Sequence, residues 1–435
     1  MSVPTPARRA AFETLRRVFE EDAWADRALR SAATRLELAG RERAQAQSLA
    51  YGAVQRRGTT DHFARELTGR SIKRLDPPII AALRLGLYEI VFAEAHVADH
   101  AAVDQSVELA KGPSGRRRGS GLVNAVLRRA VRERESLLAG LTDEEPATAA
   151  VAHSVPLWLA ELWWEELGPD DARSLLGAIN LPPERAYRAN RLDPEWGSRD
   201  AALAALTEVG VDARVPDPGH PPCPADHLIV DGGDWERVEE AVAAGRILPQ
   251  SRGSAAVVEA LAPEQGERVL DLCAGPGIKA TQIAAALGGG EGLVCVERDE
   301  GRAAELIEVL ARAGAGDAEV HRGDAADPPL RSGFDAVLVD PPCSGLGTLA
   351  SRPDARWRHR PEEIPEMAEL AERILGRAFE AVRTGGRVVY STCTVSRREN
   401  QDVASAAPAA SRGDTVQTRV DRDGTDGFFI APMRG

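Results

Sequence analysis

The chain has no apolar run near the roughly 18 residues that a transmembrane helix needs, so its sequence predicts no membrane span. No apolar signal region follows Met1, and we therefore expect a cytoplasmic protein. The five cysteines form neither a CxxC pair nor a cluster with histidine. This spacing argues against a disulfide framework and against a zinc or other metal site, and it favours reduced thiols.

Lysine is also scarce, because three lysines stand among the 54 basic residues and nearly all the others are arginines. The net charge of −13 argues against a nucleic-acid partner, since phosphate favours basic surfaces. The arginines are clustered, however, at positions 116–118, at 128, 129, 132 and 134, and at 352, 356, 358 and 360. Arginine bonds phosphate bidentately and stacks on bases. The clusters therefore favour RNA binding, but a chain that uses arginine throughout would show them as well.

The length of 435 residues and a hydrophobic content of 43% favour two or three globular domains. Residues 1–138 read as an all-α domain, because apolar residues recur at helical spacing in Ala11, Leu15, Val18 and Phe19. Pro77 and Pro78 open a predicted helix over 79–92, and further helices are expected over 101–110 and 121–135.

The remaining sequence divides into two segments after an acidic linker over 142–148. Residues 149–250 suggest a small α+β segment, with helices over 158–167 and 171–179 and a Pro-rich loop over 215–224. Residues 251–435 alternate strands with helices, which predicts an α/β, doubly wound Rossmann-like sheet. Its strands are expected at 268–273, 293–297, 319–322, 336–340 and 387–391, its helices at 279–287, 301–313 and 361–382, a closing hairpin strand at 428–431, and a poorly ordered tract at 405–414.

A Gly-rich turn joins the first of these strands to the next helix. Gly275 and Gly277 let the backbone approach a ligand closely, and the following helix offers free N–H groups. Glu297, at the end of the second strand, suits a ribose diol, and Asp324 after the third strand suits an adenine amino group. A nicotinamide dinucleotide site is the alternative, but its third glycine is absent and Pro276 is more typical of methyltransferase loops.

Two cysteines follow the last two parallel strands: Cys343 in the segment 339–345 and Cys393 in the segment 389–394. The carboxyl ends of strands in an open α/β sheet are where ligands bind, so both thiols are expected in one crevice. Paired thiols beside a nucleotide cofactor suggest covalent catalysis. The usual alternative for a free cysteine is a buried small hydrophobe, and we predict this for Cys295 and for Cys223.

These motifs resemble the RNA cytosine-5 methyltransferases of the Nol1/Nop2/Sun group. The resemblance lies in residues 273–279, 340–345, 352–357 and 390–395 and in the pair Glu399-Asn400. The helical start is similar to the transcription antitermination factor NusB in residues 50–54, 85–89 and 123–128. The fusion of both parts resembles the bacterial ribosomal RNA small-subunit methyltransferase B family.

The resemblance implies a methyl transfer from S-adenosyl-L-methionine to C5 of cytosine in 16S rRNA, free or in an assembling small subunit. Cys393 would be the nucleophile that adds to C6, Cys343 would assist product release, and Asp340 would contact the base and the cofactor. The chain departs from the family pattern at Gly275, Ile278 and Pro341. The cofactor-binding residues implied are Cys273, Ala274, Gly275, Pro276, Gly277, Ile278, Lys279, Glu297, Asp324 and Asp340.

RNA is the expected partner, and the oligomeric state stays open. The Arg352–Arg360 stretch, with Trp357 and His359, is predicted to grip unpaired RNA, although a solvated loop is the alternative. The segment 183–190 resembles the family's RNA-binding module. Two functional alternatives are the same chemistry on transfer RNA and an inactive RNA-binding assembly factor. A nicotinamide oxidoreductase is a third, but it has no use for paired thiols.

Overall fold

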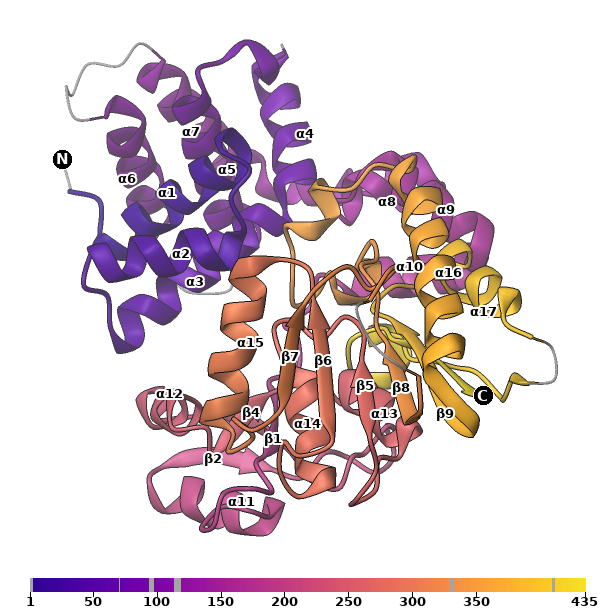
Figure 1. The fold of residues 1–435 in the computed structure, drawn as a ribbon. Coiled ribbons are helices and arrows are strands. Elements are labelled where there is room, and N and C mark those ends of the chain that lie inside the picture. Colours follow the sequence, from indigo (N-terminus) through magenta and orange to yellow (C-terminus); the bar gives the residue numbers. More distant parts are fainter. Residues whose placement is uncertain (1–2, 70, 94–97, 113–118, 329–331, 409–410) are drawn as a thin grey trace. The chain divides into compact units, whose positions relative to one another are not determined.

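The structure is a computed structural model that describes residues 3–69, 71–93, 98–112, 119–328, 332–408 and 411–435 (Figure 1). The chain packs as two units. The first is formed by the chain up to Asn180 together with Arg352–Arg358, and the second by Leu181–Ser351 with His359–Gly435. The cluster Arg116–Arg118 and the centre of the tract 405–414 lie outside the described residues.

The first unit is helical, as the periodicity predicts. Small and aliphatic side chains such as Ala11, Leu15 and Leu85 form its core, with Trp357 packed against it. Helix α5 begins at the two prolines predicted to open it. The helices are α1 (Pro6–Glu20), α2 (Ala25–Arg35), α3 (Gly40–Gln55), α4 (Arg57–Thr68), η1 (Ile72–Arg74), α5 (Pro77–Val91), α6 (Asp99–Lys111), α7 (Ser120–Ala139), α8 (Pro146–Ala152), α9 (Leu157–Leu167) and α10 (Pro169–Ala178).

A small antiparallel sheet begins the second unit, with strand order β2-β3-β1-β4. Leu206 and Val238 pack two helices against it. The predicted middle segment is therefore divided, because its helices α8–α10 belong to the first unit and its strands to the second. The elements are β1 (Ala186–Ala189), α11 (Arg199–Glu208), β2 (Val211–Arg214), β3 (His227–Gly233), α12 (Trp235–Ala243) and β4 (Ile247–Pro249).

The large sheet of the second unit has the order β10-β11-β9-β8-β5-β6-β7. Neighbours from β7 to β9 run parallel, whereas β11 runs antiparallel to β9 and to β10, which confirms the doubly wound sheet and its closing hairpin. The strands are β5 (Val269–Asp271), β6 (Leu293–Glu297), β7 (Glu319–Arg322), β8 (Phe334–Val339), β9 (Val382–Thr392), β10 (Val416–Gln417) and β11 (Phe429–Arg434).

Helices cover both faces of this sheet, and the alternation of side chains along each strand decides which face each residue enters. Leu338 and Val389 pack with α13, α14 and α15, whereas Val337 and Val388 pack with α16 and α17. The chain order reverses direction between β5 and β8, and open α/β sheets bind their ligands at the carboxyl ends of the strands on either side of such a reversal. The helices are α13 (Arg252–Leu261), α14 (Ile278–Leu287), α15 (Glu300–Arg312), α16 (Glu363–Ala381), α17 (Val403–Ala406) and α18 (Val420–Asp423), with short turns η2 (Leu346–Thr348), η3 (Ala355–Trp357) and η4 (Arg398–Asp402).

Among the described residues, no helix combines the length and the apolar character that crossing a lipid bilayer requires.

Candidate active site

The loop between β5 and α14 is built around the carboxylate of Glu297. One oxygen, Oε2, accepts a hydrogen bond from the Gly275 N–H at 3.1 Å, and the other, Oε1, accepts one from the Asp299 N–H at 2.9 Å. A Cβ on Gly275 would lie 2.2 Å from Glu297 Oε2, so glycine permits this close approach. Oε2 also lies 3.5 Å from Arg302 Nε, and Oε1 keeps a second lone pair, which fits a hydroxyl of a ribose diol. Asp324 is exposed just beyond β7.

Lys279 links this loop to the neighbouring strand end. Its Nζ lies 2.5 Å from Asp340 Oδ2 and 4.9 Å from the centre of the Phe428 ring. Burial alone would lower the pKa of Lys279, but the Asp340 carboxylate outweighs burial and raises it. Burial, with the Asp340 charge adding to it, raises the pKa of Asp271 to about 7. The loop thus carries one partly buried cation, Lys279, that is paired with the Asp340 carboxylate.

The two cysteines meet at the edge where β8 and β9 end. Their Sγ atoms lie 3.4 Å apart, and the Gly347 N–H donates to the Cys393 carbonyl at 2.9 Å. The pKa of the Cys343 thiol is raised well above its ordinary value, first by its hydrogen bond with Cys393 and then by burial. Cys343 is therefore a thiol at neutral pH. The structure brings together Cys343, Cys393, Asp340 and Lys279.

Glu399 and Asn400 stand behind these thiols, and sequence reasoning noted them only as part of a resemblance. Both are fully buried on η4, where Glu399 accepts hydrogen bonds from Ser344 and Asn400 bonds to Thr394. The available signal was their position a few residues beyond Cys393.

The other cysteines differ from one another. Cys273 is partly buried at the start of the cofactor loop, and burial raises its pKa well above the ordinary value. Cys295 is buried in mid-strand, as predicted. The prediction for Cys223 is wrong, because this residue is exposed and its Sγ donates to the Asp217 carbonyl at 3.1 Å. It lies in the Pro-rich loop, which has no apolar layer to enter.

The stretch predicted to grip RNA is largely interior to the first unit. Arg356 is fully buried, and its guanidinium donates to the Ser154 carbonyl at 3.3 Å, Asn180 Oδ1 at 3.0 Å and the Ile179 carbonyl at 3.1 Å. Trp357 Nε1 donates to the Val54 carbonyl at 2.9 Å. The prediction is therefore wrong for Arg356, whose charge is directed at the carboxyl ends of α8 and α10.

The segment 183–190, which resembles an RNA-binding module, likewise points its key side chains inward. Arg188 is buried and donates to Gln250 Oε1 at 2.7 Å and to Thr281 Oγ1 at 2.8 Å. Asn190 is buried and donates to the Gly245 carbonyl at 2.9 Å. These two side chains are inaccessible to RNA. Arg188 joins the small sheet to α14, and Asn190 also donates to the Ala313 carbonyl at 3.0 Å, just beyond α15.

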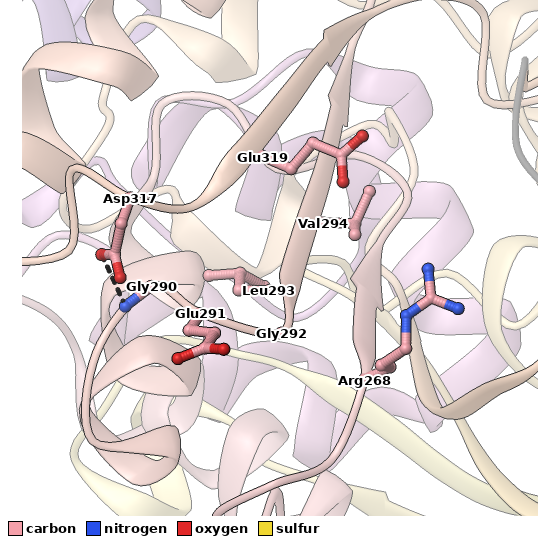
Figure 2. A pocket seen from close by; sticks show the side chains of 8 residues that line it. All are labelled: Arg268, Gly290, Glu291, Gly292, Leu293, Val294, Asp317 and Glu319. Atoms are coloured by element: carbon pink, nitrogen blue, oxygen red, sulfur yellow. Dashed lines mark hydrogen bonds between the residues drawn. The ribbon is translucent and has the colours of Figure 1, made fainter.

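A surface hollow of about 380 Å³ opens at the other end of the large sheet (Figure 2). It is lined by Arg268, Glu291, Asp317 and Glu319, where β5, β6 and β7 begin. Three carboxylates against one guanidinium disfavour an anionic ligand such as the carboxylate of a methionine tail. The hollow is therefore not the cofactor site.

The sequence of the chain matches two protein families and is similar to several known proteins. The family model described as 16S rRNA methyltransferase RsmB/F matches residues 258–418, and the NusB family model matches residues 5–132. A putative methyltransferase of Mycobacterium tuberculosis is 34% identical over 464 residues, which cover 99% of this chain and 96% of the relative. Ribosomal RNA small subunit methyltransferase B of Escherichia coli K12 is 32% identical over 373 residues, covering 84% of this chain and 81% of the relative.

Solved structures share the fold. The crystal structure of PH0851 aligns over 100% of both chains with a TM-score of 0.79 and 23% identity. That of NSun6 from Pyrococcus horikoshii with SFG covers 64% of this chain and 98% of its own, with a TM-score of 0.55 and 20% identity.

Proposed function

Because the chain belongs to the RsmB/F family of S-adenosylmethionine-dependent RNA cytosine methyltransferases, with a NusB domain ahead of the methyltransferase domain, we propose that it methylates C5 of a cytosine in 16S rRNA. The observation that carries the proposal is the 3.4 Å approach of the Cys343 and Cys393 sulfurs at the edge that also holds Lys279 and Asp340.

The residues of the loop fit the cofactor. Glu297 would accept hydrogen bonds from a ribose diol, the backbone of 273–279 would surround the methionine part, and Asp324 would face the adenine. S-adenosylmethionine supplies an electrophilic methyl group when it is bound. Lys279 holds the Asp340 carboxylate in place, so that Asp340 presents its other oxygen to the N3 and exocyclic amine edge of the base.

The thiols carry the covalent steps. Cys393, as thiolate, bonds to C6 of the cytosine, which makes C5 nucleophilic, and C5 then accepts the methyl group. The C5 proton would then pass to a water molecule, the electrons of its C–H bond would restore the C5–C6 double bond, and the bond between sulfur and C6 would break, so that Cys393 leaves as a thiolate from the methylated base. We assign attack to Cys393 and release to Cys343 from the resemblance of their two motifs to the family, and the 3.4 Å separation of the two sulfurs is compatible with both acting on one base. The base must be flipped out of any helix for C6 to be reached.

Two variants test the roles of the thiols. We expect Cys393→Ala to abolish methyl transfer to 16S rRNA while RNA affinity persists, because only the covalent step is removed. We expect Cys343→Ala to accumulate an RNA–protein adduct that survives a denaturing gel, because release is impaired. Wild-type activity in Cys393→Ala would overturn the mechanism.

The substrate is tested separately. Bisulfite mapping of ribosomal RNA from cells with and without the protein should show one cytosine losing its modification when the protein is absent. Methylation of purified transfer RNA in preference to 16S rRNA would replace the proposed substrate. If neither RNA loses a methyl group when the protein is absent, and the protein still binds RNA, the alternative of an inactive RNA-binding assembly factor is favoured.

A further inference from the structure

A buried carboxylate lies behind the two thiol loops. Glu399 is 1% exposed and stands on η4, which follows the Cys393 loop. Its Oε1 accepts a hydrogen bond from the Ser344 N–H at 2.7 Å, and its Oε2 accepts one from the Ser344 hydroxyl at 2.6 Å. Ser344 directly follows Cys343, so this carboxylate fixes both the backbone and the side chain next to the first thiol.

The same network reaches the second thiol. The hydroxyls of Thr394 and Ser344 lie 2.8 Å apart, and Thr394 Oγ1 lies 3.4 Å from Glu399 Oε2. Asn400 accepts from Thr392 Oγ1 at 2.5 Å and donates to the Thr394 carbonyl at 3.0 Å, so it holds the residues on both sides of Cys393. Glu399 and Asn400 together therefore connect the neighbours of both cysteines.

This connection matters because the cysteines are 50 residues apart and belong to different strands. One backbone bond, from the Gly347 N–H to the Cys393 carbonyl, also joins their loops. That bond fixes the main chain of Cys393 but not the residue next to Cys343. The Tyr390 hydroxyl donates to the Glu399 carbonyl at 2.5 Å, which secures η4 to β9 itself.

We propose that Glu399 is a positioning residue that holds Cys343 and Cys393 face to face by hydrogen-bonding the residues that follow them. The inference rests on the proposed roles of the thiols, because their close approach matters only if both act on one base. Burying a carboxylate carries a desolvation cost that an apolar side chain would avoid. Its hydrogen bonds to the two loops offset that cost and fix their geometry.

Four variants of the full-length protein separate this role from general stability. Glu399→Ala removes both acceptors, and Glu399→Asp withdraws them by one methylene. Glu399→Gln keeps the length and an acceptor for the Ser344 N–H, so we expect it to rescue the function. The control is Glu267→Gln, which breaks a 2.5 Å ion pair with Arg387 at the opposite end of the sheet.

The first readout measures the approach of the sulfurs without RNA or cofactor. Hydrogen peroxide oxidises the two thiols to one disulfide and is reduced to two waters, and the product has lost two hydrogens by mass. We expect the rate to fall about tenfold in Glu399→Ala and Glu399→Asp, because the attacking and resolving sulfurs no longer meet. Glu399→Gln and Glu267→Gln should stay within about threefold of the wild-type rate. Dithiothreitol should reverse the product.

The second readout is methyl transfer. We expect kcat to fall about 10- to 100-fold in Glu399→Ala and Glu399→Asp, because displacing reacting groups by about 1 Å costs rates of this order. KM for S-adenosylmethionine should stay within about twofold, since the hydrogen bonds described for Glu399 go to Ser344, Thr394 and Tyr390. Thermal unfolding of every variant shows which of them are folded, and Glu399→Asp provides the test if Glu399→Ala is not.

Wild-type disulfide rate and kcat in Glu399→Asp would overturn the inference, as would failure of Glu399→Gln to restore either rate. Neither result would contradict the proposed function, which is tested by methyl transfer in Cys393→Ala. Conversely, activity in Cys393→Ala would end the proposed function while the disulfide readout still reported whether Glu399 sets the distance between the sulfurs.

Discussion

Replacing Arg356 by methionine removes a buried guanidinium while it keeps an unbranched side chain. The Ser154 carbonyl and Asn180 Oδ1 then lose this donor inside the first unit, whereas the Ile179 carbonyl keeps a hydrogen bond from Gln55 Nε2 at 2.8 Å. A buried acceptor without a partner costs about 1–3 kcal/mol. Burial lowers the pKa of Arg356 to about 9, so the native cation is itself costly to bury and the lower end of that range applies. Two acceptors give a loss of about 2 kcal/mol.

Urea unfolding of the full chain, followed by far-ultraviolet circular dichroism, measures this loss in the transition of the helical unit. The matched control is Arg352→Met in the same segment, where the side chain is exposed and a change within about 0.5 kcal/mol is expected. Filter binding to 16S rRNA is measured in parallel. Native stability in Arg356→Met together with weakened RNA binding would refute the structural role and restore the RNA contact that the sequence suggests.

Three further perturbations follow from single contacts. Burial raises the pKa of Asp271 to about 7, so the native state keeps a proton that the unfolded chain has lost, and stability should fall as pH rises from about 4 to 7. Asp271→Asn should remove this fall, as measured by thermal unfolding across the same range. Iodoacetamide at neutral pH should alkylate the exposed Cys223 well before the buried Cys295, as peptide mass spectrometry will show. Gly347→Ala would place a Cβ 2.1 Å from the Gly427 carbonyl oxygen and 2.9 Å from that of Cys393, so kcat should fall, and an unchanged kcat would contradict the rigid loop.

The sequence predicted the large sheet well because its signals are local. Each strand is a short apolar run between turn residues, and the helices between the strands show their own periodicity. The predicted strand 293–297 coincides with β6. The predicted hairpin strand 428–431 overlaps the first half of β11. Once the strands are parallel, the topology places Cys343 and Cys393 at one edge, since β8 and β9 are neighbours.

The fate of individual arginines and cysteines was not predictable in the same way. Arg356 has the composition and neighbours of an RNA-contacting residue, but its acceptors lie up to 203 residues away in the chain. No local pattern reports such distant carbonyls. Cys223 shows the reverse case, because average burial of cysteine predicts an interior position, whereas the Pro-rich loop around it keeps it at the surface.

Within the candidate site, the sequence predicts some features and does not predict others. Topology determines that two thiols arrive at one edge, but it does not determine which of them remains protonated. The pKa of Cys343 is raised by groups whose positions depend on tertiary packing: first by its hydrogen bond with Cys393, then by burial, and then by the charges of Glu399 and Asp340. A sequence therefore predicts that two thiols share one edge of the sheet, whereas the electrostatic surroundings of each sulfur depend on the buried groups behind them.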